Sequence, residues 1–188
     1  MNTRWLIPMA ALLALSCSMG NRNSALVVTK LVLGTATTTG TPAVTTCSYD
    51  PSAVEFDFAQ IDPTANSGGT MGVVVQNNLL DPTAINPLFR TNSASFHAHQ
   101  VVADYEMIGG TTLTEQIIPV SGGSISTGSA GAVLVPFFAP IPTTTLSGII
   151  RVIFHIEGTL DDGSNVRTSE HEYVFVTCAT AGCNSSCL

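Results

Sequence analysis

Two histidines, His97 and His99, lie two residues apart in the segment Ser-Phe-His-Ala-His-Gln. Alternate residues of a β-strand point to the same face, so both imidazoles could chelate one metal ion. A third ligand would come from His155 or His171. Residues 149–177 are predicted below to form a β-hairpin, and its register puts these two histidines on opposite faces of the sheet, so both cannot join one site. We therefore interpret His97 and His99 as surface residues of a strand and only weak candidates for metal ligands.

Other motifs that carry chemistry are incomplete or have a simpler explanation. The segment Asp-Asp-Gly-Ser-Asn at residues 161–165 lacks the alternating ligands and the distal Glu of a calcium loop, and a hairpin turn explains it. The chain has no Gly-x-Ser-x-Gly motif. Its paired glycines at 68–69 and 122–123 lie in turn-like segments and not before a helix. We therefore predict no enzymatic activity and no cofactor.

The five cysteines predict disulfide chemistry and a lipid anchor. They are Cys17, Cys47, Cys178, Cys183 and Cys187. If Cys17 carries a lipid, an even set of four remains, which in an exported protein predicts two disulfides. Three pairings are possible, and each of them joins Cys47 to one of the three C-terminal cysteines. A zinc site is the alternative, but Cys-x4-Cys-x3-Cys lacks the tight Cys-x2-Cys pair of structural zinc sites.

The N-terminus has the features of an export signal. Arg4 supplies a positive charge, and residues 5–15 form an apolar run interrupted only by Pro8. A run of this length matches the apolar core of a signal peptide and is shorter than the ~20 residues that span a bilayer. No later segment is long and apolar enough to cross a membrane. We therefore expect an exported protein that is not integral to the membrane.

Residues 13–17, Leu-Ala-Leu-Ser-Cys, resemble the lipobox of bacterial lipoproteins. In that family cleavage follows the small residue before the cysteine, and the cysteine sulfur receives diacylglycerol, which implies lipidation of Cys17. The aliphatic and small residues preferred upstream are shifted by one position here. Ordinary signal cleavage near Ser16 or Gly20 is the alternative. Ser18 replaces the Asp that marks inner-membrane retention in the family, which favours the outer membrane.

Charge excludes one class of partner. Without residues 1–16 the chain has five basic and thirteen acidic side chains, a formal charge of −8. A nucleic-acid-binding protein needs a basic surface, which this chain lacks. The acidic balance also argues against electrostatic docking onto anionic lipid. With 45% hydrophobic residues, the chain has enough apolar surface to fold around a core.

The elements that position these residues are predicted to be strands. Eight β-type runs alternate with segments rich in Gly, Pro, Asn, Asp and Thr, which predicts an antiparallel sandwich or barrel of about seven to nine strands. The runs cover residues 26–33, 53–59, 72–77, 95–108, 115–119, 131–138, 147–160 and 166–178. Residues 35–46 are interpreted as a flexible or edge-strand connection, open to glycosylation. A short helix is possible at 82–89.

The C-terminal hairpin gives a specific register. A two-residue turn at Asp162-Gly163 suits the positive φ of a type I′ turn and sets Leu160 opposite Asn165. A slip by one residue would bury two glutamates, which is costly for unpaired charges. The predicted pairs are therefore Ile150 with Phe175, Val152 with Tyr173, Phe154 with His171, and His155 with Glu170.

Several motifs together resemble a family. They are the lipobox, Cys-Ser-Tyr-Asp at 47–50, Val-Val-Val-Gln-Asn-Asn-Leu at 73–79, Arg-Thr-Asn-Ser at 90–93, Val-Val-Ala-Asp-Tyr at 101–105 and a cysteine-bearing C-terminus. This order resembles uncharacterised bacterial lipoproteins of myxobacterial type and covers most of the mature chain. The resemblance implies an Ig-like or related β-sandwich displayed on the envelope and no established activity. The segment 183–187 departs from the pattern.

We therefore expect three regions: a signal peptide at 1–16, a lipidated cysteine and tether at 17–25, and one β-sandwich with a disulfide-bonded tail at 26–188. The predicted function is a structural or interaction module held at the outer membrane through its lipid, with an envelope protein as possible partner. One alternative is an extracytoplasmic lipoprotein that binds a metal or a carbohydrate, although aromatic residues for stacking on sugars are few, at 6%. A hydrolase with an unrecognised site is the second alternative.

Overall fold

The computed structural model describes residues 25–55, 59–61, 70–80, 94–108, 112–139, 141 and 148–177. These residues form thirteen strands and no helix, which confirms the all-β prediction. The strand number exceeds the expected seven to nine because several strands have only two or three residues. No helix long and apolar enough to cross a membrane occurs among the described residues. The short helix expected at 82–89 and the signal, lipobox and tether residues lie outside them.

A first sheet has four strands in the order β1-β5-β10-β8, all paired antiparallel. Its strands are β1 (Leu26–Val32), β5 (Thr70–Asn77), β10 (Ala130–Pro136) and β8 (Ser121–Gly122). The central strand β5 is buried at almost every position, which suits its run of valines and its place between two neighbours.

A second, larger sheet has seven strands: five lie along the main path β4-β13-β11-β6-β7, β12 pairs with β11, and β9 pairs with β6. Its strands are β4 (Ala59–Ile61), β13 (His171–Thr177), β11 (Ile149–Leu160), β6 (Phe96–Met107), β7 (Thr112–Pro119), β12 (Asn165–Arg167) and β9 (Ser124–Ile125). Among its described pairs only β13 with β4 is parallel. The strand expected at 53–59 is wrong over 53–55, because Ala53 lies in a bend and 54–55 belong to no strand, whereas Ala59 begins β4. Residues 56–58 lie outside the described residues.

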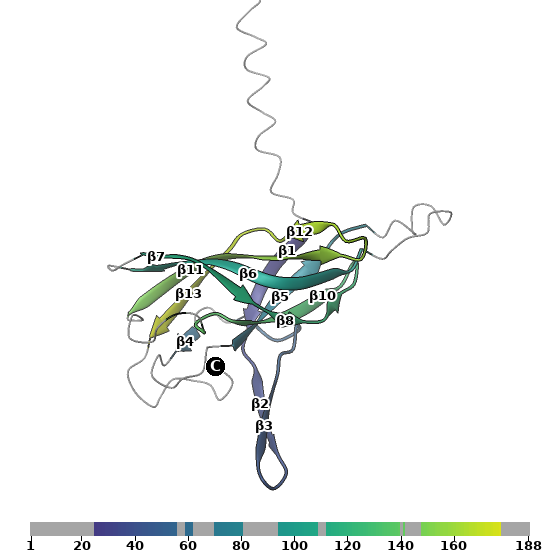
Figure 1. Ribbon diagram of the computed structural model, residues 1–188. Helices are drawn as coiled ribbons and strands as arrows, with labels where there is room; N and C mark the ends of the chain where they lie inside the picture. Colours follow the sequence, from purple (N-terminus) through teal and green to yellow (C-terminus); the bar gives the residue numbers. More distant parts are fainter. Residues whose placement is uncertain are drawn as a thin grey trace, which may run out of the picture.

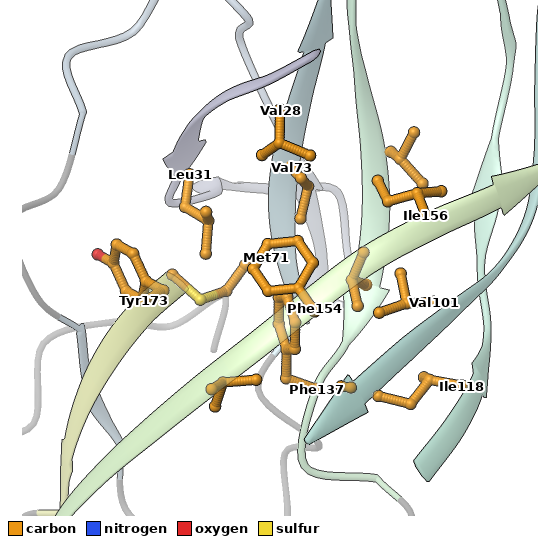
Figure 2. Close-up of a cluster of buried hydrophobic side chains, with 14 of the residues drawn as sticks. Val28, Leu31, Met71, Val73, Val101, Ile118, Phe137, Phe154, Ile156 and Tyr173 are labelled. Atoms are coloured by element: carbon orange, nitrogen blue, oxygen red, sulfur yellow. The ribbon is translucent and has the colours of Figure 1, made fainter. Parts of the chain in front are cut away.

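One hydrophobic core joins the two sheets and makes the fold a β-sandwich. Figure 2 shows Leu31 and Val73 of the first sheet beside Val101 and Phe154 of the second. Phe137, which follows β10, fills the centre and makes an edge contact to the Phe154 ring at a centroid distance of 5.0 Å. Each such side chain contributes roughly 1.5–3 kcal/mol by leaving water. The inward residues of β11 supply one wall, as its alternating sequence predicts: Ile150, Val152, Phe154 and Ile156.

The predicted register of the C-terminal hairpin is confirmed along β13 and wrong at the turn. Phe154 pairs with His171, as predicted. The other two predicted pairs on β13, Val152 with Tyr173 and Ile150 with Phe175, are also observed. Near the turn, however, Thr159 pairs with Asn165 where Leu160 was expected. The loop has three residues, 161–163, and Gly163 takes a positive φ of 83° at its end. This is the geometry of a type I turn that ends in a bulge.

A one-residue irregularity at 168–170 restores the register between β12 and β13. Thr168 is buried there, its backbone N–H donates to the Ile156 carbonyl at 2.9 Å, and its Oγ1 accepts from the Ile156 N–H at 3.0 Å. These two bonds satisfy backbone groups that regular pairing would have used. The expected pairing of His155 with Glu170 is wrong, because Glu170 lies inside this irregularity.

Residues 35–48 form a hairpin of their own, whereas the sequence predicts a flexible or edge-strand connection over 35–46. β2 (Thr35–Thr39) and β3 (Val44–Ser48) pair antiparallel in a separate two-stranded sheet. Figure 1 shows this hairpin pointing away from the sandwich. Cross-strand threonines such as Thr37 with Thr46 favour strand pairing without any buried face. Cys47 on β3 is disulfide-bonded. The other cysteines lie outside the described residues, so its partner stays a prediction.

Candidate functional site

A polar groove opens at one end of the large sheet, where β6, β11 and β12 lie side by side. We call it the β6–β11–β12 groove, and its volume is about 550 Å³. Its lining consists of His99 and Gln100 from β6, Glu157 and Gly158 from β11, and Asn165, Val166 and Arg167 from β12. A volume of this size lies within the ~300–1,000 Å³ of ligand pockets, and the residues around it are mainly hydrogen-bonding groups.

A bulge in β6 shapes the groove. Glu157 pairs with Gln100 and Gly158 pairs with Ala98, which leaves His99 as the extra residue. A bulge bends its strand and redirects side chains, so consecutive residues His99 and Gln100 both line the groove. Gly158 permits the close approach of the strands, because a Cβ at this position would lie 2.1 Å from the His97 carbonyl oxygen.

Glu157 is the centre of the polar contacts in this groove. Gln100 Nε2 donates to Glu157 Oε2 at 2.7 Å, and His155 Nε2 lies 3.4 Å from Glu157 Oε1. The Gln100 hydrogen bond lowers the pKa of Glu157, and His155 and the nearby Arg167 charge lower this pKa further. The carboxylate is therefore ionised at neutral pH and held between two neighbours.

The four histidines do not form a metal site in the described part of the chain. His97 Nε2 lies 2.6 Å from Asp161 Oδ1, whereas His99 Nε2 lies 2.9 Å from Thr159 Oγ1. Nowhere in the described ranges do three or more His, Cys, Asp or Glu side chains gather in a way that could hold a metal ion. His155 lies on the outer face with Glu157, as the predicted register requires.

His171 lies on the inner face, as predicted, with its ring 5.6 Å from that of Phe154. Burial lowers its pKa from the usual 6.5. In the turn between β11 and β12, the Asp162 carboxylate accepts hydrogen bonds from the backbone N–H and the hydroxyl of Ser164, at 2.8 and 2.6 Å. The interpretation of residues 161–165 as a hairpin turn is therefore correct.

The outer face of the large sheet combines apolar and charged side chains. We define the outer sheet face by four apolar residues on β6, β7, β11 and β13 and by four charged residues beside them. The apolar residues are Val102, Ile117, Ile153 and Val174, and the charged residues are Asp104, Glu106, Arg151 and Glu172. Ile117 has 60% of its surface exposed, and the other three are half-buried.

Arg151 binds two glutamates on this face. Its Nε and Nη2 donate to the two carboxylate oxygens of Glu172 at 2.7 and 2.8 Å, and its Nη1 donates to Glu106 at 3.1 Å. The bonds to Glu172, followed by the bond to Glu106, raise the pKa of Arg151. These are exposed ion pairs, which fix the orientation of the side chains more than they stabilise the fold.

Neither family models, nor curated proteins, nor solved structures match this chain. Function therefore has to be inferred from the chain itself.

Sequence patterns did not identify the groove as a site. The alternation of residues 149–160 predicts Glu157 on the outer face, two residues after His155, and the structure agrees, but Gln100, Asn165 and Arg167 belong to no motif. The groove depends on the β6 bulge and on the three-residue turn, and neither changes the alternation of residue types enough to be seen. The one available signal was Gly158 within an otherwise β-branched and aromatic strand, which is typical of close backbone approach. Cys17, Cys178, Cys183 and Cys187 lie outside the described residues.

Proposed function

We propose that this protein is a lipid-anchored module of the cell envelope, without enzymatic activity, that binds a partner protein through the outer sheet face. The observation that carries the proposal is the exposed and half-buried apolar surface of this face, centred on Ile117 and Val102, which pair across β7 and β6. Apolar residues gathered on one sheet face and bordered by charges are typical of protein interfaces.

The strand order supports an Ig-like version of the sandwich. In Ig domains one sheet has the order A-B-E-D and the other contains C, F and G, with C′ added beside C in variable types. Assigning these letters in chain order to β1, β5, β6, β7, β8, β10, β11 and β13 gives A-B-E-D and G-F-C-C′ for the two main sheets. The domain lacks the disulfide between strands B and F, since neither β5 nor β11 contains a cysteine. Ig-like domains commonly serve as recognition modules on cell surfaces.

The charge of the face indicates the chemistry of the partner. Glu106 and Glu172 share the single guanidinium of Arg151, so this cluster keeps a net negative charge. The mature chain has a formal charge of −8. The proposed partner is therefore an envelope protein that presents an apolar patch bordered by Lys or Arg, because complementary charge favours and accelerates association.

Photo-crosslinking in native cells tests the partner. A photoreactive residue at Ile117 should give one dominant crosslinked envelope protein. The same residue at Val44, which is 56% exposed on β3, is a matched exposed apolar control and should not give that product. Identical products from both positions, or no product from Ile117, would contradict the proposed interface.

The anchor has a separate test. We propose that Cys17 carries the lipid and that the protein is held at the outer membrane, because several acyl chains on one cysteine give stable attachment. Cys17→Ser should move the protein from the membrane fraction to the soluble envelope fraction. An N-terminal peptide with an unmodified Cys17 thiol in the native protein would contradict the anchor.

A second candidate function is extracytoplasmic ligand binding. The β6–β11–β12 groove favours it, because ionised, amide and imidazole groups gather there around an open volume.

A further inference from the structure

We propose that the β6–β11–β12 groove binds a neutral saccharide, with Glu157 accepting from and Arg167 donating to hydroxyl groups of the sugar. This inference rests on the second candidate function, ligand binding, and does not require the protein partner or the lipid anchor.

The Glu157 carboxylate is oriented but not saturated. Gln100 occupies one acceptor position on Oε2, and His155 lies beside Oε1. A carboxylate has about four acceptor positions on its two oxygens, so each oxygen keeps one for a ligand. Two oxygens at a fixed separation match two donors on adjacent atoms, as in the vicinal hydroxyls of a sugar.

Arg167 supplies the complementary donors. Its charge acts on Glu157, yet its guanidinium makes no hydrogen bond or ion pair to another described residue. Arg151, on the same sheet, donates three hydrogen bonds to Glu106 and Glu172. A guanidinium has five N–H donors, so Arg167 can donate to ligand oxygens without breaking an existing bond.

The charges that line the groove favour a neutral ligand. The lining holds one carboxylate, Glu157, and one guanidinium, Arg167, so their charges offset each other and neither an anion nor a cation finds a net opposite charge there. A hydroxyl group both donates and accepts, so it suits a lining that combines a carboxylate acceptor, a guanidinium donor and the Asn165 amide. Val166, the apolar residue of the lining, offers a surface for the C–H groups of a sugar ring.

Backbone irregularities on both sides of β11 hold this arrangement. The β6 bulge positions Gln100 against Glu157, and the irregularity at 168–170 sets the register of the β12 strand that carries Asn165 and Arg167. Bulges next to binding sites often redirect side chains in this way. Gln100 and His155 hold the Glu157 carboxylate in one orientation, so little ordering of this side chain is needed on binding.

The test uses the detergent-solubilised full chain on an array of defined saccharides: maltohexaose, cellohexaose, chitohexaose and the acidic oligogalacturonate. We expect binding of at least one neutral saccharide and none of oligogalacturonate. For the best neutral saccharide, calorimetry should show that Glu157→Gln and Arg167→Ala each weaken binding about tenfold or more, as expected for hydrogen bonds to charged groups.

Arg151→Ala is the matched control, because it removes an exposed arginine from the same sheet outside the groove. Binding should stay within about twofold of the original, since the two arginines share no contact. Asn165→Ala is a second groove variant in case one charged substitution disturbs folding, which the unfolding midpoint of each variant reveals. It should weaken binding while the midpoint stays unchanged.

Three results would overturn the inference: no binding to any neutral saccharide of the set, binding of oligogalacturonate alone, or an equal loss of affinity in Arg151→Ala. Failure here is distinguishable from failure of the partner proposal. The Ile117 crosslink reports the outer sheet face and should persist in Glu157→Gln, whatever the saccharide array shows.

Discussion

Asn77, at the end of β5, is a polar side chain with no exposed surface. Its Nδ2 donates to the carbonyls of Ala94 and Ile125 at 2.8 and 2.9 Å, and its Oδ1 accepts from the Leu79 N–H at 3.0 Å. One amide therefore satisfies three backbone groups from separate segments. A buried backbone group left without a partner costs roughly 1–3 kcal/mol.

We predict that Asn77→Ala lowers the free energy of unfolding by about 2–4 kcal/mol, measured by urea denaturation. The neighbouring Asn78 is exposed, so Asn78→Ala is the control and should change the free energy of unfolding by less than about 0.5 kcal/mol. Equal effects of the two substitutions would show that the buried amide has no special role.

His171 gives a prediction about pH. Burial lowers its pKa below the usual 6.5, while Glu55 and Glu172 oppose this shift more weakly. Between the folded pKa and 6.5 the unfolded chain binds more protons, so stability rises with pH across this window. The contribution of His171 is complete above about pH 6.5 and is lost as pH falls toward the folded pKa.

Imidazole NMR titration of the folded chain and of the chain in concentrated urea measures both pKa values of His171. We expect the folded value to be lower. His171→Phe should remove part of the loss of stability below pH 6.5, because a phenyl ring keeps the contact with Phe154 without binding a proton. A folded pKa at or above the unfolded value would contradict the prediction.

At the scale of elements, the register of a strand could be predicted where its buried and exposed residues alternate clearly in the sequence. The alternation in β11 and the paired aromatic residues of β13 fixed their register, because a slip would have buried charges. The β2–β3 hairpin had no such pattern, since its threonines are exposed and neither face contacts a core. Pairing there depends on cross-strand neighbours, which no single segment reveals.

The β6–β11–β12 groove could be predicted only in part, because part of it depends on features that leave no burial pattern in the sequence. Alternation placed Glu157 on the outer face, but a bulge adds one residue to one strand only. The sequence of β6 does not say where that residue lies. The turn after β11 also differs from the prediction, because Asp162-Gly163 fits a two-residue turn as well as the observed three-residue turn with glycine last.

Gly158 tests the element that shapes the groove. A Cβ there would meet the His97 carbonyl oxygen at 2.1 Å and the Phe96 ring at 2.7 Å, so β6 and β11 would have to separate. We predict that Gly158→Ala lowers the free energy of unfolding by about 3 kcal/mol in urea denaturation. Gly123→Ala is the control, since a Cβ at Gly123 has no atom within 4 Å. A loss no larger than that of the control would mean that β6 can shift without cost.

For the whole molecule, the two sheets share one core, but the β2–β3 hairpin contributes none of its residues. An isolated two-stranded hairpin has marginal stability in water, so a covalent link would help to hold it. Cys47 on β3 is disulfide-bonded, which places such a link on the hairpin itself. The predicted partner is Cys178, Cys183 or Cys187, so the bond would tie the hairpin to the C-terminal end of the chain.

This tie would close a loop of roughly 130 residues, nominally worth about 4–5 kcal/mol through the entropy of the unfolded chain. We therefore predict that a reductant lowers the urea midpoint of unfolding and that Cys47→Ser lowers it even without reductant. Cys17→Ser is the control and should leave the midpoint unchanged, because a lipidated cysteine takes no part in the bridge. Mass mapping of the unreduced protein identifies the pairing. A bond between Cys47 and Cys17 would contradict both the tie and the lipid anchor, because a sulfur in a disulfide cannot also carry diacylglycerol.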